Sequence, residues 1–238
     1  MPTALITGAS AGLGRALATE LAGLGWRLVL TARGAERLTH VAAELAHPSS
    51  VTTIAGDVAD PEHRARVVGR INQLGRLDLL VNNASTLGPT PLRPLAALSP
   101  TDLSTVLAVN VIGPFALAAA LLPALTAAHG VVLDISSDAA AEHYPDWGGY
   151  GASKAALDHL TLTLGVENVD IACYAIDPGD MRTDMQQAAF PGEDISDRQL
   201  PAAVVPALLQ LIASRPPSGR YRADDVAVLV GAGVAVTA

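Results

Sequence analysis

The chain has 238 residues, of which 50% are hydrophobic and 16% charged, and its formal net charge is −8. This composition excludes a disordered chain, and the acidic balance argues against nucleic-acid or anionic-membrane partners, which need basic patches. The single cysteine, Cys173, excludes an internal disulfide framework and a cysteine-based zinc site, and fits a cytoplasmic location. Because no uninterrupted apolar run reaches about 18 residues and no basic region precedes the first one, we expect neither a membrane span nor a signal peptide.

Short apolar runs alternate with longer helical patterns along the chain. The predicted strands are Ala4–Thr7, Leu28–Thr31, Val51–Ala55, Leu77–Val81, Val131–Ile135, Ile171–Ile176 and Val226–Val230. The predicted helices are Gly12–Leu24, Ala35–Ala46, Pro61–Leu74, Pro100–Ala128, Tyr150–Val166 and Pro201–Ala213. Most of the runs are rich in Val, Ile or Leu on both faces, as strands buried on both sides of a sheet are. The alternation predicts an α/β fold: a doubly wound parallel sheet of about seven strands with helices on both faces, in one domain over residues 1–238.

The first strand leads into a glycine-rich turn, TGASAGLG. Gly8 allows a tight turn, Gly12 lets the backbone approach a pyrophosphate, and Gly14 lets the next helix pack closely on the strand. The helix that follows presents free N–H groups to an anion. An ordinary glycine-rich turn is the alternative, but the order of strand, turn and helix favours a dinucleotide phosphate site.

Six motifs in the same order resemble those of the short-chain dehydrogenases/reductases, and they span residues 3–183. After the glycine turn come Asp57 in GDV, Asn82-Asn83-Ala84, Asn110 in the long helix, Ser136-Ser137 with Tyr150-x-x-x-Lys154, and Pro178-Gly179 with Thr183. The resemblance implies a Rossmann-type, NAD(P)-dependent oxidoreductase that reduces a carbonyl or oxidises the alcohol, and a homodimer or homotetramer. One departure is Ser85, which stands where the family has a glycine.

The acid–base chemistry is expected at Tyr150 and Lys154. A tyrosine with its ordinary pKa of about 10 is a poor acid or base at neutral pH, and a lysine one helical turn away would lower that pKa. Ser137 would hydrogen-bond the substrate oxygen as charge develops. By resemblance, Lys154 also holds the nicotinamide ribose and Asn110 anchors a water in a proton path. The structural alternatives are a surface pair for the YxxxK residues, a plain strand end for the serine and a core amide for the asparagine, with Ser136 as the near alternative to Ser137.

The second strand ends without the acidic residue that would bind a ribose 2′-hydroxyl. Ala32 holds that position and Arg33 follows, whose guanidinium suits a 2′-phosphate, and Ser10 could add a hydroxyl. We therefore expect NADP(H) to be preferred over NAD(H), although Ala11 stands where NADP-preferring members often carry a second basic residue. The expected cofactor contacts are Gly8, Ser10, Gly12, Leu13, Gly14, Arg33, Asp57, Val58, Asn83, Ala84, Tyr150, Lys154, Pro178, Gly179, Met181 and Thr183.

Imidazole and aromatic rings cluster in the segment between the serine and tyrosine motifs, although the chain as a whole is only 3% aromatic. They hint at a flat or apolar carbonyl substrate, with loop packing or a subunit contact as the alternative. Residues 181–200 resemble the family's substrate-closing segment. The candidate substrate contacts are His143, Tyr144, Trp147, Met185 and Phe190.

Two rival functions and one absence complete the prediction. The histidines show no metal spacing, so no metal is expected. A non-catalytic NADP(H)-binding regulatory module is the main rival, but such relatives usually lose the tyrosine or the lysine. An epimerase or dehydratase of the extended branch of the fold would need a substrate domain for which 238 residues leave no room.

Overall fold

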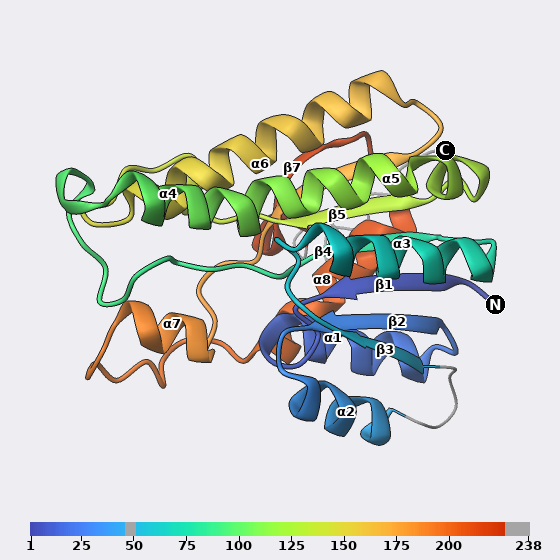
Figure 1. The fold of residues 1–238 in the computed structure, drawn as a ribbon, viewed down its shortest axis with the longest axis horizontal. Helices are drawn as coiled ribbons and strands as arrows, with labels where there is room; N and C mark the ends of the chain where they lie inside the picture. The colour runs from blue at the N-terminus through green and yellow to red at the C-terminus, as the bar shows by residue number, and fades with distance from the viewer. Residues whose placement is uncertain (46–50, 227–238) are drawn as a thin grey trace.

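The structure is a computed structural model that describes residues 1–45 and 51–226. Its centre is a seven-stranded sheet in the order β3-β2-β1-β4-β5-β6-β7 (Figure 1), in which all neighbouring strands are parallel. The strands are β1 (Thr3–Thr7), β2 (Arg27–Ala32), β3 (Val51–Ala55), β4 (Leu79–Asn82), β5 (Val131–Ile135), β6 (Ala172–Asp177) and β7 (Gly219–Arg222). The strand order reverses between β1 and β4, and ligands of such sheets bind at the carboxyl ends beside that point.

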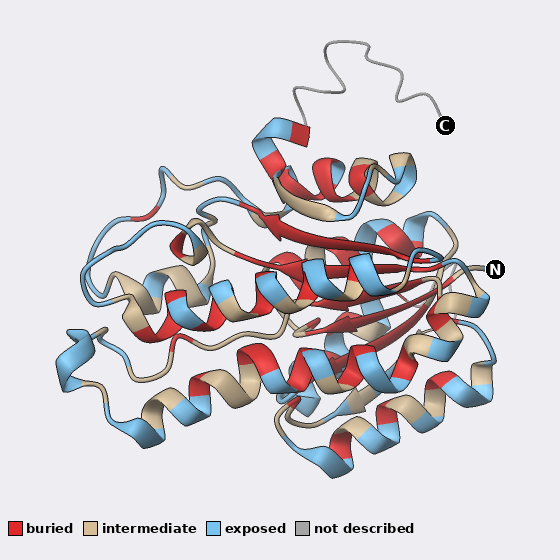
Figure 2. Cartoon of the chain, turned by 90° about the horizontal axis from the view of Figure 1, so that it is seen from above, coloured by how far each residue is buried: buried red, intermediate tan, exposed pale blue. Residues whose placement is uncertain are grey.

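Helices cover both faces of the sheet, as the sequence predicts. The helices are α1 (Gly12–Gly23), α2 (Ala35–Glu44), α3 (Pro61–Leu74), α4 (Pro100–Leu107), α5 (Gly113–Ala127), α6 (Gly148–Glu167), α7 (Asp184–Ala189) and α8 (Pro201–Ser214). Helices α1, α2 and α8 pack on one face and α3, α5 and α6 on the other, whereas α4 and α7 lie outside both sheet cores. Successive residues of β1 enter different cores, because strand side chains alternate: Ala4 and Ile6 pack with α1, α2 and α8, whereas Leu5 packs with α3 and α5. Figure 2 shows the buried strands between the two helical layers.

Two helices begin at the side chains that predicted them. The Asp60 carboxylate accepts a hydrogen bond from the backbone N–H of Glu62 at 2.9 Å, and Pro61 occupies the first turn of α3. Ser99 and Asp102 form a reciprocal capping box at the start of α4. These caps fix where α3 and α4 leave the loops that follow β3 and β4 at the carboxyl edge of the sheet.

The predicted helix over residues 100–128 contains a wider turn in its middle. Residues 108–112 form a π-helical turn, η2, between α4 and α5. Pro114 explains it, because a proline has no N–H to donate to the carbonyl four residues earlier, which belongs to Asn110. The combined helix, Pro100–Ala127, is long and apolar enough to cross a bilayer by length and composition. Its apolar residues, among them Leu117 and Leu121, pack into the sheet core, which accounts for that composition.

One prediction about the C-terminal half is wrong. The seventh strand is Gly219–Arg222, not Val226–Val230: Val226 is helical, and residues 227–230 lie outside the described part of the chain. Within residues 1–45 and 51–226, strand β7 pairs with β6 alone, and it is half-buried, so its sequence, GRYR, lacks the apolar run of a central strand. Residues 181–200 contain a short helix, α7. Thr183 caps its start by accepting a hydrogen bond from the N–H of Gln186 at 3.1 Å.

One predicted helix end in the N-terminal half, Ala46, lies outside the described residues.

Candidate active site

A cleft of about 1030 Å³ opens at the carboxyl edge of the sheet. It brings together residues predicted from seven separate stretches of sequence. The predicted residues that line it are Gly8, Ser10, Gly12, Leu13, Arg33, Asp57, Val58, Asn83, Ala84, Ser137, Tyr144, Trp147, Tyr150, Lys154, Pro178, Gly179, Met181, Thr183, Met185 and Phe190. Gly14, Asn110 and His143 do not line it.

The two ends of the glycine turn differ in their surroundings: Gly12 faces the open cleft, whereas Gly14 is closely packed. Gly12 has a φ of +54°, and the nearest atom to a Cβ built on it would be Thr183 Cγ2 at 3.5 Å, so this backbone faces open cleft. A Cβ on Gly14 would lie 2.6 Å from the carbonyl oxygen of Gly8, too close to be accommodated. Asn83, directly after β4, stabilises the glycine turn: its Nδ2 donates to the carbonyls of Thr7 and Gly8 at 2.9 and 3.1 Å. This cradle fits the pyrophosphate of a dinucleotide, with Gly14 serving helix packing and Asn83 the shape of the turn.

Tyr150 lies in the first turn of α6 and is 8% exposed. The neighbouring Ser137 and Ser85 hydroxyls lower the pKa of its phenol, but burial is the larger effect and raises that pKa. The expectation of a lowered tyrosine pKa is therefore wrong for this protein without cofactor. Lys154 Nζ lies 5.5 Å from the centre of the Tyr150 ring, and it donates to the carbonyl of Ile135 at 2.6 Å. Ser137, and not Ser136, is the serine that reaches the phenol.

A buried carboxylate influences the charge of Lys154. Asp134, in β5, accepts hydrogen bonds from Asn82 Nδ2 at 2.7 Å and Thr161 Oγ1 at 2.6 Å, and burial raises its pKa to about 6. Burial lowers the pKa of Lys154 to about 8, while the negative charges of Asp134 and Asp158 act in the opposite direction. Asp134 thus favours the cationic form of a lysine that is only 2% exposed.

The Asn110 amide is fully engaged inside the protein. Its Nδ2 donates to the Thr86 carbonyl and to Ser153 Oγ, both at 2.9 Å. Its Oδ1 accepts from the Thr86 N–H at 2.8 Å and from Ser85 Oγ at 3.2 Å. An amide has two donors and two acceptor sites, so none is left for water.

Two arginines line the cleft beside the end of β2 and the start of α2, away from Tyr150. Arg33, after β2, and Arg37, in the first turn of α2, line the cleft with Ser10 and are exposed. Arg37 Nη1 lies 3.5 Å from the carboxylate of Asp184 in α7. The Asp57 carboxylate accepts from the N–H of Ala59 at 2.8 Å and shapes the loop after β3. The arginine pair suits a phosphate on an adenosine ribose.

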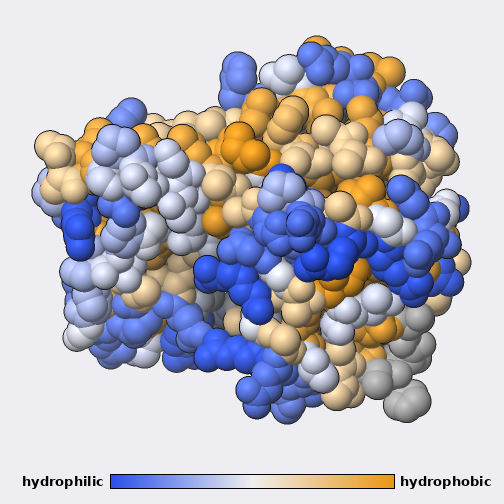
Figure 3. Space-filling model, viewed as in Figure 1, coloured by the Kyte–Doolittle hydropathy of each residue, from blue (hydrophilic) through white to orange (hydrophobic). Residues whose placement is uncertain are grey.

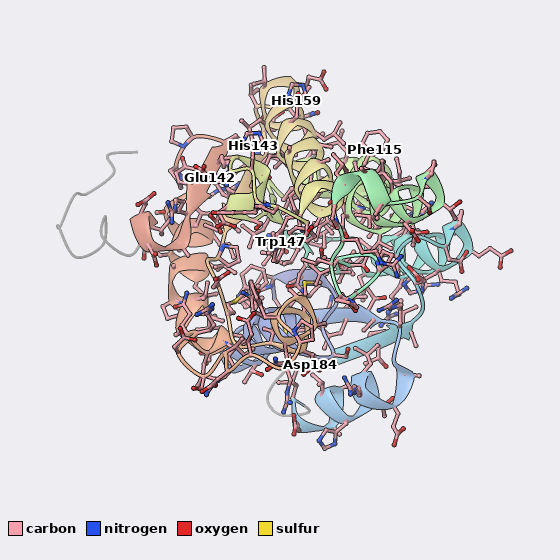
Figure 4. The ribbon with its side chains drawn as sticks, turned by 90° about the vertical axis from the view of Figure 1, so that its left-hand side faces the viewer. Phe115, Glu142, His143, Trp147, His159 and Asp184 are labelled. Atoms are coloured by element: carbon pink, nitrogen blue, oxygen red, sulfur yellow. The ribbon has the colours of Figure 1, made fainter. Side chains whose placement is uncertain are left out.

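The wall beyond Tyr150 is aromatic. The Trp147 ring meets Tyr150 edge-on at 5.6 Å and lies 6.0 Å from Phe190. Tyr144 also lines the cleft, and its hydroxyl donates to Asp138 at 2.9 Å. His143 does not belong to this wall: it is exposed, and Figure 4 shows it beside Glu142 and apart from Trp147.

The family model for the short chain dehydrogenases matches residues 2–194. The chain is a member of the short-chain dehydrogenase/reductase family. It is 34% identical to serine 3-dehydrogenase of Agrobacterium fabrum over 89% of this chain and 85% of that protein. It is 36% identical to sulfoacetaldehyde reductase 2 of Chromohalobacter salexigens over 71% and 70%. A short chain dehydrogenase of Shigella flexneri solved with NADP superposes with a TM-score of 0.87, 30% identity, and coverage of 94% and 97%. The short-chain dehydrogenase/reductase described here is thus an oxidoreductase.

Sequence reasoning missed three residues of this dehydrogenase. Arg37 carried a signal, because it is a second basic residue only four positions after Arg33. Ser85 was noted only as a departure from the family. Arg220, in β7, donates to the Ser137 carbonyl and to Asp158 Oδ2, both at 2.9 Å, and so helps hold the loop that carries the serine. Nothing in the sequence signalled Arg220, since the strand that carries it was placed elsewhere.

Proposed function

We propose that this dehydrogenase is a cytoplasmic, NADP(H)-preferring enzyme that interconverts neutral, largely apolar carbonyl compounds and their alcohols. In this proposal residues 1–238 act as one cofactor-binding domain, and Asn110, Ser137, Tyr150 and Lys154 form the catalytic set. The observation that carries the proposal is that Tyr150 lines one cleft together with the glycine turn and the arginines expected to bind the cofactor, and with the aromatic wall of Trp147 and Phe190. The bound nicotinamide would supply or accept the hydride.

The side chains have distinct tasks in the reduction. Ser137 donates a hydrogen bond to the substrate oxygen and stabilises the negative charge that develops there. Tyr150 then donates its proton to that oxygen, and burial favours this direction because the raised pKa keeps the phenol protonated. The positive charge of Lys154 stabilises the phenolate that remains. The saturated Asn110 amide holds this part of the site in place through Ser153 Oγ, which donates to the Tyr150 carbonyl at 2.6 Å.

The cofactor preference rests on Arg33 and Arg37. Among the described residues that line the cleft, they and Lys154 carry the basic side chains. Fluorescence titration of the purified protein tests the preference directly: NADPH is expected to bind at least about tenfold more tightly than NADH, which is about 1.4 kcal/mol. Equal or tighter binding of NADH would contradict the arginine argument, and binding of neither would contradict the cofactor assignment itself.

The substrate class follows from the charge of the aromatic end. Two relatives are named for compounds that contain an anionic group: the carboxylate of serine and the sulfonate of sulfoacetaldehyde. In this chain Asp138 and Asp180 line the cleft, and the negative charge of each acts on Tyr144 of the aromatic wall, whereas Arg33 and Arg37 line the cofactor end. We expect 4-methylbenzaldehyde to be reduced with a kcat/KM at least about tenfold above that of 4-carboxybenzaldehyde, because the buried anion would lack a partner. The reverse order would contradict the proposal of a neutral substrate.

A homodimer or homotetramer fits the exposed apolar side chains of two neighbouring helices. Phe115, in α5, is 53% exposed and Val166, in α6, is 80% exposed. Figure 3 shows apolar side chains over the upper helices, and Figure 4 shows Phe115 on that side of the molecule. Such a patch is typical of a subunit contact. Light scattering of the purified protein would contradict this if it gave the mass of a single chain.

The charge of Asp134 predicts a pH effect. Asp134→Asn keeps the side-chain shape, and Thr161 Oγ1 keeps its hydrogen bond to the Leu157 carbonyl at 2.8 Å. Removing the negative charge lowers the pKa of Lys154 below its value of about 8. The alkaline limb of kcat/KM for reduction is therefore expected to move by roughly one unit toward lower pH. An unmoved limb in a variant that unfolds like the wild type would show that Asp134 does not control the lysine.

A further inference from the structure

Ser85 occupies a position between two members of the proposed catalytic set. It lines the cleft directly after Ala84 and belongs to the loop that follows β4. Its Oγ donates a hydrogen bond to Asn110 Oδ1 at 3.2 Å. The same hydroxyl lowers the pKa of the Tyr150 phenol and lines the same cleft, so it lies within reach of the phenol oxygen. Asn110 therefore reaches Tyr150 by two routes: through Ser153 to the backbone of the tyrosine, and through Ser85 to its hydroxyl.

The backbone around Ser85 is held independently of its side chain. The N–H of Ala84 donates to Thr7 Oγ1 at 3.0 Å, and the N–H of Thr86 donates to Asn110 Oδ1 at 2.8 Å. Both bonds are made by neighbours of Ser85, so loss of its hydroxyl leaves the loop anchored on both sides. The serine hydroxyl is thus preorganised toward the phenol and is not needed to hold the loop.

We propose that Ser85 is a positioning residue for the acid–base step, which it assists by turning its hydroxyl from Asn110 to the Tyr150 oxygen when that oxygen becomes charged. A serine hydroxyl has one proton to donate, and in the described state that proton goes to Asn110. When Tyr150 has given up its proton, the phenolate is the stronger acceptor. The switch leaves no acceptor unsatisfied, because Asn110 Oδ1 keeps the N–H of Thr86. The serine keeps its proton throughout, and only a hydrogen bond changes partner.

The inference rests on the proposed role of Tyr150, and it predicts an asymmetry between the two directions of reaction. Alcohol oxidation requires the phenolate before the proton of the alcohol can be accepted, whereas reduction begins from the neutral phenol. The hydrogen bond from Ser85 forms only when Tyr150 is a phenolate. It therefore assists oxidation more than reduction. Without Ser85 Oγ, Tyr150 should need a higher pH to become a base.

The test compares Ser85→Ala and Ser85→Gly with wild type in oxidation of 1-phenylethanol by NADP⁺ across pH 6–10. Both variants are expected to move the acidic limb of kcat/KM by about one unit to higher pH and to lower oxidation at neutral pH by about tenfold. Their reduction rates at neutral pH should change less than their oxidation rates. The matched control is Ser104→Ala on the exposed face of α4, whose hydroxyl bonds only the Pro100 carbonyl in the described structure, at 2.8 Å.

Each outcome assigns the result to one cause. An unmoved acidic limb in both variants overturns the role of Ser85. A shift in Ser85→Gly alone also overturns it, because glycine changes the backbone as well as the hydroxyl. Failure of the proposed function looks different: Tyr150→Phe would then retain wild-type rates in both directions, whatever the Ser85 variants do.

Discussion

Tyr150→Phe is expected to lower kcat/KM for carbonyl reduction by about 10²–10⁴-fold. The phenylalanine ring keeps the edge-on contact with Trp147, whose centre lies 5.6 Å from that of Tyr150, so the cleft should keep its shape. What is lost is the proton donor next to Ser137 and the oxygen whose charge Lys154 stabilises. The measurement is steady-state reduction of 4-methylbenzaldehyde, followed by NADPH absorbance.

Binding and a second tyrosine serve as controls. The NADPH affinity of Tyr150→Phe should remain within about threefold of wild type, or about 0.65 kcal/mol. Tyr221→Phe removes a hydroxyl that donates to the Pro217 carbonyl at 2.7 Å away from the cleft, and its turnover should match wild type. Undiminished turnover in Tyr150→Phe would remove the tyrosine from the chemistry. If wild type also bound NADPH but reduced no carbonyl compound, the regulatory-module interpretation would gain support.

The sequence predicted the architecture well where a signal repeats along the chain. Buried parallel strands need apolar residues on both faces, so β1, β2 and β5 stand out as runs, and Asp60 and Ser99 mark helix starts by local chemistry. The half-buried strand β7 shows neither signal, because in the part of the chain that the structure describes it pairs with β6 alone, and because it is largely polar. An edge strand is specified by the sheet that it joins, and the sequence around it does not contain that information.

The site shows the same division between local motifs and long-range contacts. The YxxxK spacing places Tyr150 and Lys154 on one helical face without any knowledge of the fold. The direction of the tyrosine pKa could not be predicted, because burial by surrounding segments outweighs the neighbouring hydroxyls. Asp134 acts on Lys154 from another element, 20 positions earlier in the numbering of the chain. Motif spacing identifies which groups react, whereas their protonation depends on packing that only the structure supplies.

The double variant Arg33→Ala/Arg37→Ala is expected to weaken NADPH binding by roughly 10–100-fold while changing NADH affinity by less than about threefold. The two cofactors differ by the 2′-phosphate, so a selective loss assigns both guanidinium groups to it. Both arginines are exposed, so water and salt screen their charges. This screening sets the upper limit of the expected loss of NADPH affinity. Raising the salt concentration should narrow the difference between wild type and variant for the same reason.

The control for this variant lies in β2, the strand that precedes both arginines. Arg27→Ala changes a basic residue at the opposite end of β2, outside the cleft, and should leave both affinities unchanged. The single variants separate the two side chains: Arg37 also faces the Asp184 carboxylate at 3.5 Å, so part of its charge is already neutralised. Arg33→Ala should therefore cost more NADPH affinity than Arg37→Ala. An equal loss of NADPH and NADH in the double variant would show that the arginines hold a group common to both cofactors.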